Sequence, residues 1–181
     1  MSESTEPHLS FERLYETHRR AVLAYCLRRA SRSDAHDAVA ETFAVAWRRM
    51  DDVPAGDEAL PWLYAVAYRT LGNMHRSTRR RRKLAEKVSG TELTSPPIPL
   101  DTQVIRSAEA QTVLDAMTRL KPSDRELLRL TIWEELPREQ VAKVLGISRE
   151  AVNQRFVRAV KRMGKELVRV GINPSEEGGG A

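Results

Sequence analysis

The chain has 181 residues, of which 41% are hydrophobic and 30% charged, with a formal net charge of +5 and a pI near 9.6. This composition is sufficient for a packed core and favours a polyanionic partner, either nucleic acid or an anionic membrane surface. Membrane insertion is not expected, because no run of about 18 apolar residues occurs, and the polar, acidic start does not resemble a secretory signal.

The cysteine and histidine content indicates the compartment of the protein and whether it binds a metal. The single cysteine, Cys26, rules out an internal disulfide and is expected to be a small buried hydrophobe in a reducing compartment. The four histidines show no metal-ligand spacing. We therefore expect a cytoplasmic protein without a metal or another cofactor.

Helical periodicity dominates the first part of the chain. Apolar residues recur on one helical face from Phe11 to Cys26, with Ser10 as the expected N-cap and His18 as a packed core histidine. A second helix is expected after Ser33. No segment shows a convincing alternation typical of a strand.

A third helix is expected to begin near Pro61, because a proline in the first turn costs no helical hydrogen bond. It continues into HRSTRRRRK at residues 75–83, and no acidic residue lies between Trp62 and Lys83. Such a charge run is usually a solvated surface. The alternative is a phosphate-binding surface, and the choice depends on the rest of the chain.

The sequence changes character after this block. Residues 85–106 are rich in Ser, Thr and Pro and predict an extended linker. A second set of helices starts near Ser107, and residues 123–126 have the form of a capping box. We predict an all-α fold of two small helical domains joined by a flexible linker. The predicted domains are 10–84 and 107–172, with disordered ends at 1–9 and 173–181.

Residues 136–163 predict that the C-terminal domain is a helix-turn-helix. A short apolar helix ends at Gly146, which adopts the left-handed cap conformation at little cost, and Ser148 can cap the next helix. The core face of this second helix is expected to contain Val152, Phe156, Ala159, Val160 and Met163. Its polar face carries Arg149, Asn153, Gln154, Arg155, Arg158, Lys161 and Arg162. These side chains suit base edges and phosphates, which favours DNA binding over a helical hairpin with a solvated basic face.

From Phe11 to Val170 the chain resembles an extracytoplasmic-function sigma factor of the sigma-70 family, the two-domain class of bacterial initiation factors. DAHDAVAETFAVAW at 34–47 resembles region 2.2, and PWLYAVAYRTLGNMHRSTRR at 61–80 resembles regions 2.3 and 2.4. The helix-turn-helix resembles region 4. Its recognition helix matches the family pattern at Val152, Arg155, Phe156, Arg158 and Ala159.

The sequence departs from the family pattern at four positions. Ala40 stands where region 2.2 often has Gln, at a position that contacts polymerase in the family. Arg69 stands where many members have Asn, near the pocket for an extruded promoter base. Ala151 replaces a common Thr, and Pro137 replaces a capping Ser, although a proline can still begin a helix.

The resemblance implies a sigma factor and not an enzyme. Its partners would be promoter DNA, core RNA polymerase through the beta-prime and beta subunits, and an anti-sigma factor. The implied core-polymerase-binding residues are Asp37, Glu41 and Phe43. The implied DNA-binding residues for the −10 element are Arg69, Asn73, Arg76, Arg79 and Arg80. Those for the −35 element are Arg149, Asn153, Gln154, Arg155, Arg158 and Lys161.

This interpretation gives the basic run a role. Its N-terminal end would bind phosphates, whereas Arg82 and Lys83 would be the solvated start of the linker. Unstacked bases need a stacking platform, for which Trp62, Tyr64 and Tyr68 are candidates, although Trp62 alone fits a core position better.

Three other classes compete with this interpretation. A regulator that binds an operator by itself would explain the helix-turn-helix but not the first domain. A sigma-like mimic that titrates a regulator would not need basic surfaces in both halves. An enzyme would need a phosphate loop, a metal cluster or a nucleophile with a base partner, and the sequence offers none of them.

Overall fold

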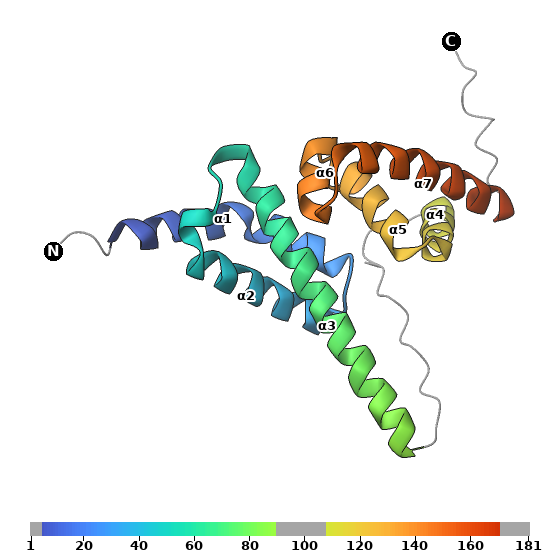
Figure 1. Cartoon of the computed structure of the whole chain (residues 1–181), viewed down its shortest axis with the longest axis horizontal. Coiled ribbons are helices and arrows are strands. Elements are labelled where there is room, and N and C mark those ends of the chain that lie inside the picture. The colour runs from blue at the N-terminus through green and yellow to red at the C-terminus, as the bar shows by residue number, and fades with distance from the viewer. Residues whose placement is uncertain (1–4, 90–107, 171–181) are drawn as a thin grey trace, which may run out of the picture. The chain divides into compact units, whose positions relative to one another are not determined.

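The protein is described by a computed structural model that covers residues 5–89 and 108–170 (Figure 1). Within these ranges the chain is helical and contains no strand, so the predicted all-α fold class is confirmed. The helices form two compact units, Met1–Leu100 and Asp101–Ala181. The predicted linker from residue 90 onwards, the predicted tail at 173–181 and the first four residues lie outside the described residues.

The first unit consists of α1 (Thr5–Leu27), α2 (Arg32–Arg48) and α3 (Ala59–Ser89), which all pack against one another. Small side chains on α2, such as Ala35 and Ala38, are fully buried and let the helices approach closely. The C-terminal part of α3 extends past the other two helices (Figure 1). The core contains Val22, Tyr25, Cys26, Ala46, Leu63, Ala67 and Leu71.

The starts of α1 and α2 differ from the prediction. Helix α1 begins at Thr5, so Ser10 lies inside it and is not its cap; Pro7 is tolerated because it lies in the first turn. Helix α2 is capped by Ser31, whose Oγ accepts a hydrogen bond from the backbone N of Asp34 at 3.2 Å. Ser31 and Ser33 both lie near the start of α2, and the sequence pattern does not show which of them is the cap.

An aromatic stack connects α1 and α3 in the core. The rings of Tyr25 and Tyr64 lie with centroids 4.6 Å apart and planes 19° apart. The guanidinium of Arg29 lies 3.5 Å from the Tyr25 ring centroid, and its Nη1 donates to the Tyr25 carbonyl at 2.9 Å. Half-buried His18 also lies on α1, where desolvation lowers the pKa of its imidazole, as fits a packed histidine.

Helix α3 is longer than predicted. It contains Pro61 in its first turn, as expected, and continues through the whole basic run to Ser89. Lys83 therefore lies on a helix and not at the start of an extended linker. The reason is local, because the residues after Lys83 read Leu-Ala-Glu-Lys, all of which favour helix.

The second unit consists of α4 (Ala108–Arg119), α5 (Pro122–Leu128), a π-helical turn (Arg129–Trp133), α6 (Arg138–Leu145) and α7 (Arg149–Arg169). Helices α4, α5 and α6 all pack against α7. Arg125 closes the end of α4, because its guanidinium donates to the carbonyls of Met117, Thr118 and Leu120 at 2.6–3.1 Å. Burial lowers the pKa of Arg125.

The predicted capping box at 123–126 is wrong. Helix α5 starts at Pro122, its N-cap position is Lys121, and no side chain caps it. Ser123 therefore lies inside the first turn, while Asp124 and Glu126 are buried within the unit. Proline at the first position fixes the start of this helix two residues too early for the box, which would need Ser123 in the N-cap position.

The turn of the helix-turn-helix follows the prediction. Gly146 ends α6 in the left-handed conformation, with φ 65° and ψ 39°. Ile147 then donates its backbone N–H to the Ala142 carbonyl at 3.1 Å. Ser148 caps α7, since its Oγ accepts from the backbone N of Ala151 at 3.1 Å.

Candidate polymerase-binding and nucleic-acid-binding surfaces

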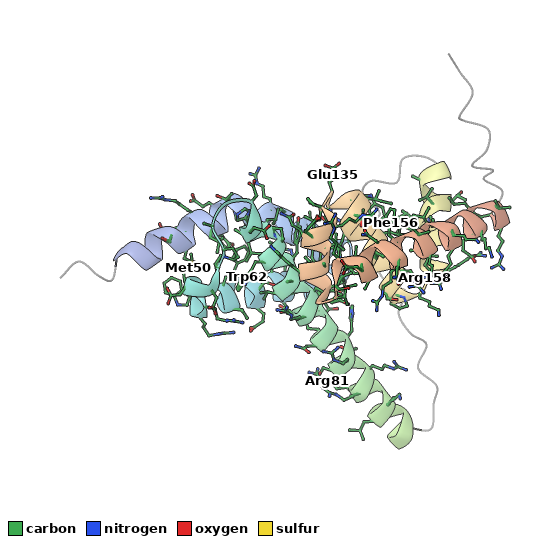
Figure 2. All side chains as sticks on the ribbon, turned by 45° about the horizontal axis from the view of Figure 1, so that its top comes forward. Met50, Trp62, Arg81, Glu135, Phe156 and Arg158 are labelled. Carbon is green, nitrogen blue, oxygen red and sulfur yellow. The ribbon has the colours of Figure 1, made fainter. Side chains whose placement is uncertain are left out.

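Helix α7 has a buried face and a basic exposed face. Val152 and Ala159 are fully buried against the unit. Arg158 and Gln154 are exposed on the other side, and Figure 2 shows Arg158 and Phe156 leaving the helix in different directions. The Arg158 Nε donates to the Gln154 backbone carbonyl at 3.1 Å, one turn earlier on the same helix. The exposed predicted residues on α7 are Arg149, Asn153, Gln154, Arg155, Arg158 and Lys161.

Two contacts fix the start of α7 against α6. Arg149 Nε lies 3.0 Å from Glu139 Oε1, and both side chains are more than half exposed. The Arg138 guanidinium lies 3.7 Å from the ring centroid of half-buried Phe156. Arg149 therefore has an acidic neighbour from α6, which DNA phosphates would have to replace. The sequence pattern did not predict either contact.

Arg162 differs from the other cations on the polar face of α7, because it is paired within its own unit. Its Nη1 forms an ion pair with Asp124 Oδ2 of α5, and the Asp124 side chain is only 7% exposed. This pair holds α7 against α5. Val160, predicted for the core face, is instead 45% exposed, because it lies about 80° around the helix from Val152.

The exposed part of α3 carries a basic stripe, defined here as Arg69, Asn73, Arg76 and Arg80. These positions follow the spacing i, i+4, i+7, i+11 and therefore share one helix face. All four side chains are exposed, and buried Leu63, Ala67 and Leu71 lie on the opposite side. Arg79 is exposed on the flank of the stripe. Other side chains, Arg81 among them, stand out around this part of α3 (Figure 2).

Within the basic stripe, Arg76 and Asn73 are joined. The Arg76 Nη2 donates to Asn73 Oδ1 at 2.6 Å. Gly72 lies beside them, and a Cβ there would stand 3.6 Å from Arg76 Nη1, which is an ordinary contact. The guanidinium of Arg76 is therefore held by a neighbour on its own helix, one turn away.

The three aromatic candidates for base stacking fall into different environments. Tyr68 is 37% exposed, and Trp62 is half-buried near the start of α3 (Figure 2). Tyr64 is only 4% exposed and stacks on Tyr25 in the core. Tyr64 is therefore a packing residue, which leaves Tyr68 and Trp62 as candidates.

The predicted polymerase-binding residues on α2 are not equivalent. Asp37 and Glu41 are exposed, one helical turn apart, and Glu41 forms an ion pair with Arg48 at 2.9 Å. Phe43 is 4% exposed and its ring lies 4.8 Å from that of Tyr15. Phe43 thus differs from the expectation, because it supports α2 from the core and does not present a surface for a partner.

Neither a metal cluster nor a membrane span is found in the described ranges. No three His, Cys, Asp or Glu side chains are grouped so that they could bind a metal ion in this part of the chain. No helix among these residues is both long and apolar enough to cross a bilayer.

The two helical units, one with a basic stripe and one with a helix-turn-helix, define a DNA-binding transcription protein. The family model of sigma-70 region 2 matches residues 14–81, and that of sigma-70 region 4 matches residues 110–163. The RNA polymerase sigma factor NccH of Alcaligenes xylosoxydans xylosoxydans is 30% identical over 154 residues, which cover 83% of this chain and 82% of NccH. The sigma factor CnrH of Cupriavidus metallidurans is 30% identical over 134 residues, 70% of each chain.

Solved structures agree on the fold. The sigma factor RpoE of Bartonella quintana, in complex with the anti-sigma factor NepR, superposes with a TM-score of 0.66 at 21% identity, over 90% of this chain and 98% of RpoE. CnrH in complex with the cytosolic domain of CnrY gives 0.56 at 22% identity, over 88% of each chain. The protein belongs to the sigma-70 family of RNA polymerase sigma factors and is of the extracytoplasmic-function type. A regulator that acts without polymerase is not favoured, because the region 2 match covers most of the first unit.

Proposed function

We propose that this sigma factor acts in the cytoplasm and divides promoter recognition between its two units. The first unit binds core polymerase through the exposed face of α2, with Asp37 and Glu41, and binds the −10 element through the basic stripe of α3. The second unit reads the −35 element with the exposed face of α7. The observation that carries this proposal is the presence of two separate exposed basic faces, one in each unit.

Because two DNA-binding faces lie on one chain, we expect promoter binding to depend on the spacing between the −10 and −35 elements. Each face alone binds DNA weakly, but binding of one raises the effective concentration of the other. The gain disappears when the two promoter elements are too far apart for the connecting residues to span. Spacing between the elements is therefore part of the specificity that we propose.

An anti-sigma factor is a further proposed partner. The related RpoE and CnrH were solved with NepR and with the cytosolic domain of CnrY, respectively. A protein that covers the α2 face or the basic stripe would prevent polymerase or DNA binding. This proposal rests on the likeness to those proteins and on the accessibility of both faces.

The experiment that tests the proposed function compares promoter binding with and without core polymerase. We expect sequence-specific binding and transcript initiation only when core polymerase is present. Promoters selected from a genomic or random library by the reconstituted holoenzyme would supply the sequences. Tight sequence-specific binding by the free protein, together with no initiation by the holoenzyme, would support an operator-binding regulator instead.

The salt dependence of promoter binding tests the basic part of α3. Replacing Arg79 and Arg80 with alanine should weaken holoenzyme binding to all promoters evenly, because phosphate contacts carry no base information. The slope of log K against log salt should become shallower by about 0.9 for each phosphate on duplex DNA that the variant no longer neutralises. A salt titration of promoter binding measures both effects.

The matched control for this titration removes the same charge from another helix. Arg19 and Arg20 are exposed on α1, and their replacement by alanine should leave the slope unchanged. Equal slopes for the wild type and the Arg79/Arg80 variant would show that the basic run is only a solvated surface.

A further inference from the structure

The basic stripe contains one residue that is not an arginine. Asn73 lies between Arg69 and Arg76 on the same exposed face. Arginines bind phosphates without needing base information, whereas a carboxamide carries no charge and is suited to a base edge. Asn73 is therefore the uncharged member of the stripe, and its amide suits a base edge better than a phosphate.

The contact with Arg76 fixes which way the Asn73 amide points. A guanidinium has five N–H donors and no acceptor, so it can bond only to the oxygen of the amide. The Arg76 Nη2 lies 2.6 Å from Asn73 Oδ1, in agreement with this requirement. The Asn73 Nδ2 group, with its two N–H donors, is left to face a ligand.

This arrangement weakens the usual preference of asparagine for adenine. An Asn that pairs with adenine uses its oxygen to accept from N6 and its nitrogen to donate to N7. Here Arg76 engages one lone pair of the oxygen, and the positive guanidinium repels the amino group of a base that approaches the other lone pair. A keto oxygen, in contrast, is attracted both by the Asn73 N–H groups and by the Arg76 charge.

We propose that Asn73 and Arg76 form a donor-only base-reading pair that selects a keto base, guanine or thymine, over an amino base, adenine or cytosine, at one position of the −10 element. The difference between keto and amino bases holds for an extruded base and for the major-groove edge of a pair, because O6 and O4 are acceptors and N6 and N4 are donors on both. This inference rests on the proposed role of α3 at the −10 element and adds the chemistry of the base that it selects.

The test measures base preference and not affinity alone. Holoenzyme reconstituted from core polymerase and the full-length protein is used to select initiating promoters from a library randomised across the −10 element. In the wild type we expect one position at which keto bases are enriched roughly tenfold. This is the effect of gaining one good hydrogen bond to the preferred base that the other bases cannot make. Asn73→Ala should abolish this enrichment. Arg76→Ala should free the amide oxygen and lower the ratio of keto to amino bases at that position alone.

The matched control is Arg79→Ala, which removes one charge from the same part of α3 without touching Asn73. It should weaken selection evenly and leave the keto preference intact. If Arg76→Ala behaves like Arg79→Ala, or if the position that depends on Asn73 prefers an amino base, the donor-only pair is overturned. A wild-type holoenzyme that selects no promoter sequences at all would instead overturn the proposed function itself.

Discussion

Replacing Gln154 and Arg158 with alanine is expected to abolish discrimination of the −35 element. Both side chains lie on the exposed side of α7, away from buried Val152 and Ala159. Removing one base-specific hydrogen-bonding side chain should cost about 1–3 kcal/mol of discrimination, or roughly 5- to 150-fold in relative binding. Transcription from promoters with intact and with mutated −35 elements measures the effect. The double variant should initiate equally from both.

Core-polymerase affinity and a matched variant serve as controls. The Gln154/Arg158 variant should bind core polymerase as the wild type does, because polymerase binding is assigned to α2. Arg169→Ala removes a cation from the end of the same helix, where Arg169 pairs with Glu166 at 2.7 Å, and should leave −35 discrimination intact. Loss of core-polymerase affinity in the double variant, with −35 discrimination retained, would contradict the assignment of α7.

The helix-turn-helix could be predicted because its signals are local. Gly146 is needed where the backbone φ is positive, and Ser148 caps a helix by accepting from the backbone three residues further on. The apolar spacing of Val152 and Ala159 then determines which face of α7 is buried. Each of these features is contained within one or two turns of the chain.

The role of Arg162 could not be predicted in the same way. Its partner, Asp124, lies 38 residues earlier, and the sequence around Asp124 also fits a capping box. From the spacing alone, Arg162 is one more cation beside Arg158. Only the packing of α5 on α7 separates a structural cation from those that we propose to face DNA.

The burial of two aromatic residues in the first unit could not be predicted from the sequence either. Phe43 and Tyr64 both occur in segments that resemble functional regions of the family, and both are only 4% exposed. An aromatic ring is compatible with a core and with a binding surface, and residue type does not distinguish them. Only their burial in the folded unit, where Phe43 contacts Tyr15 and Tyr64 stacks on Tyr25, identifies them as packing residues.

Arg162→Ala is expected to destabilise the second unit strongly. The substitution leaves the Asp124 carboxylate, 7% exposed, without its cation. Removing one partner of a buried pair costs about 3–5 kcal/mol, and the lower end applies because the Arg162 side chain is 45% exposed. For a unit of this size, a decrease of about 3 kcal/mol in the free energy of unfolding lowers Tm by roughly 12–24 °C. Thermal unfolding of the full-length protein, followed by circular dichroism, measures this shift.

A comparison with Arg155→Ala separates the structural role of Arg162 from DNA binding. Arg155 is exposed on the same helix, so its replacement should change stability by no more than about 0.5 kcal/mol while weakening −35 binding. Arg162→Lys keeps a cation near Asp124 and should recover part of the stability, because the charge remains while the guanidinium geometry does not. If Arg162→Ala keeps the wild-type Tm and loses only −35 binding, then Arg162 contacts DNA, as its place on the polar face of the sequence suggested, and the ion pair with Asp124 contributes little.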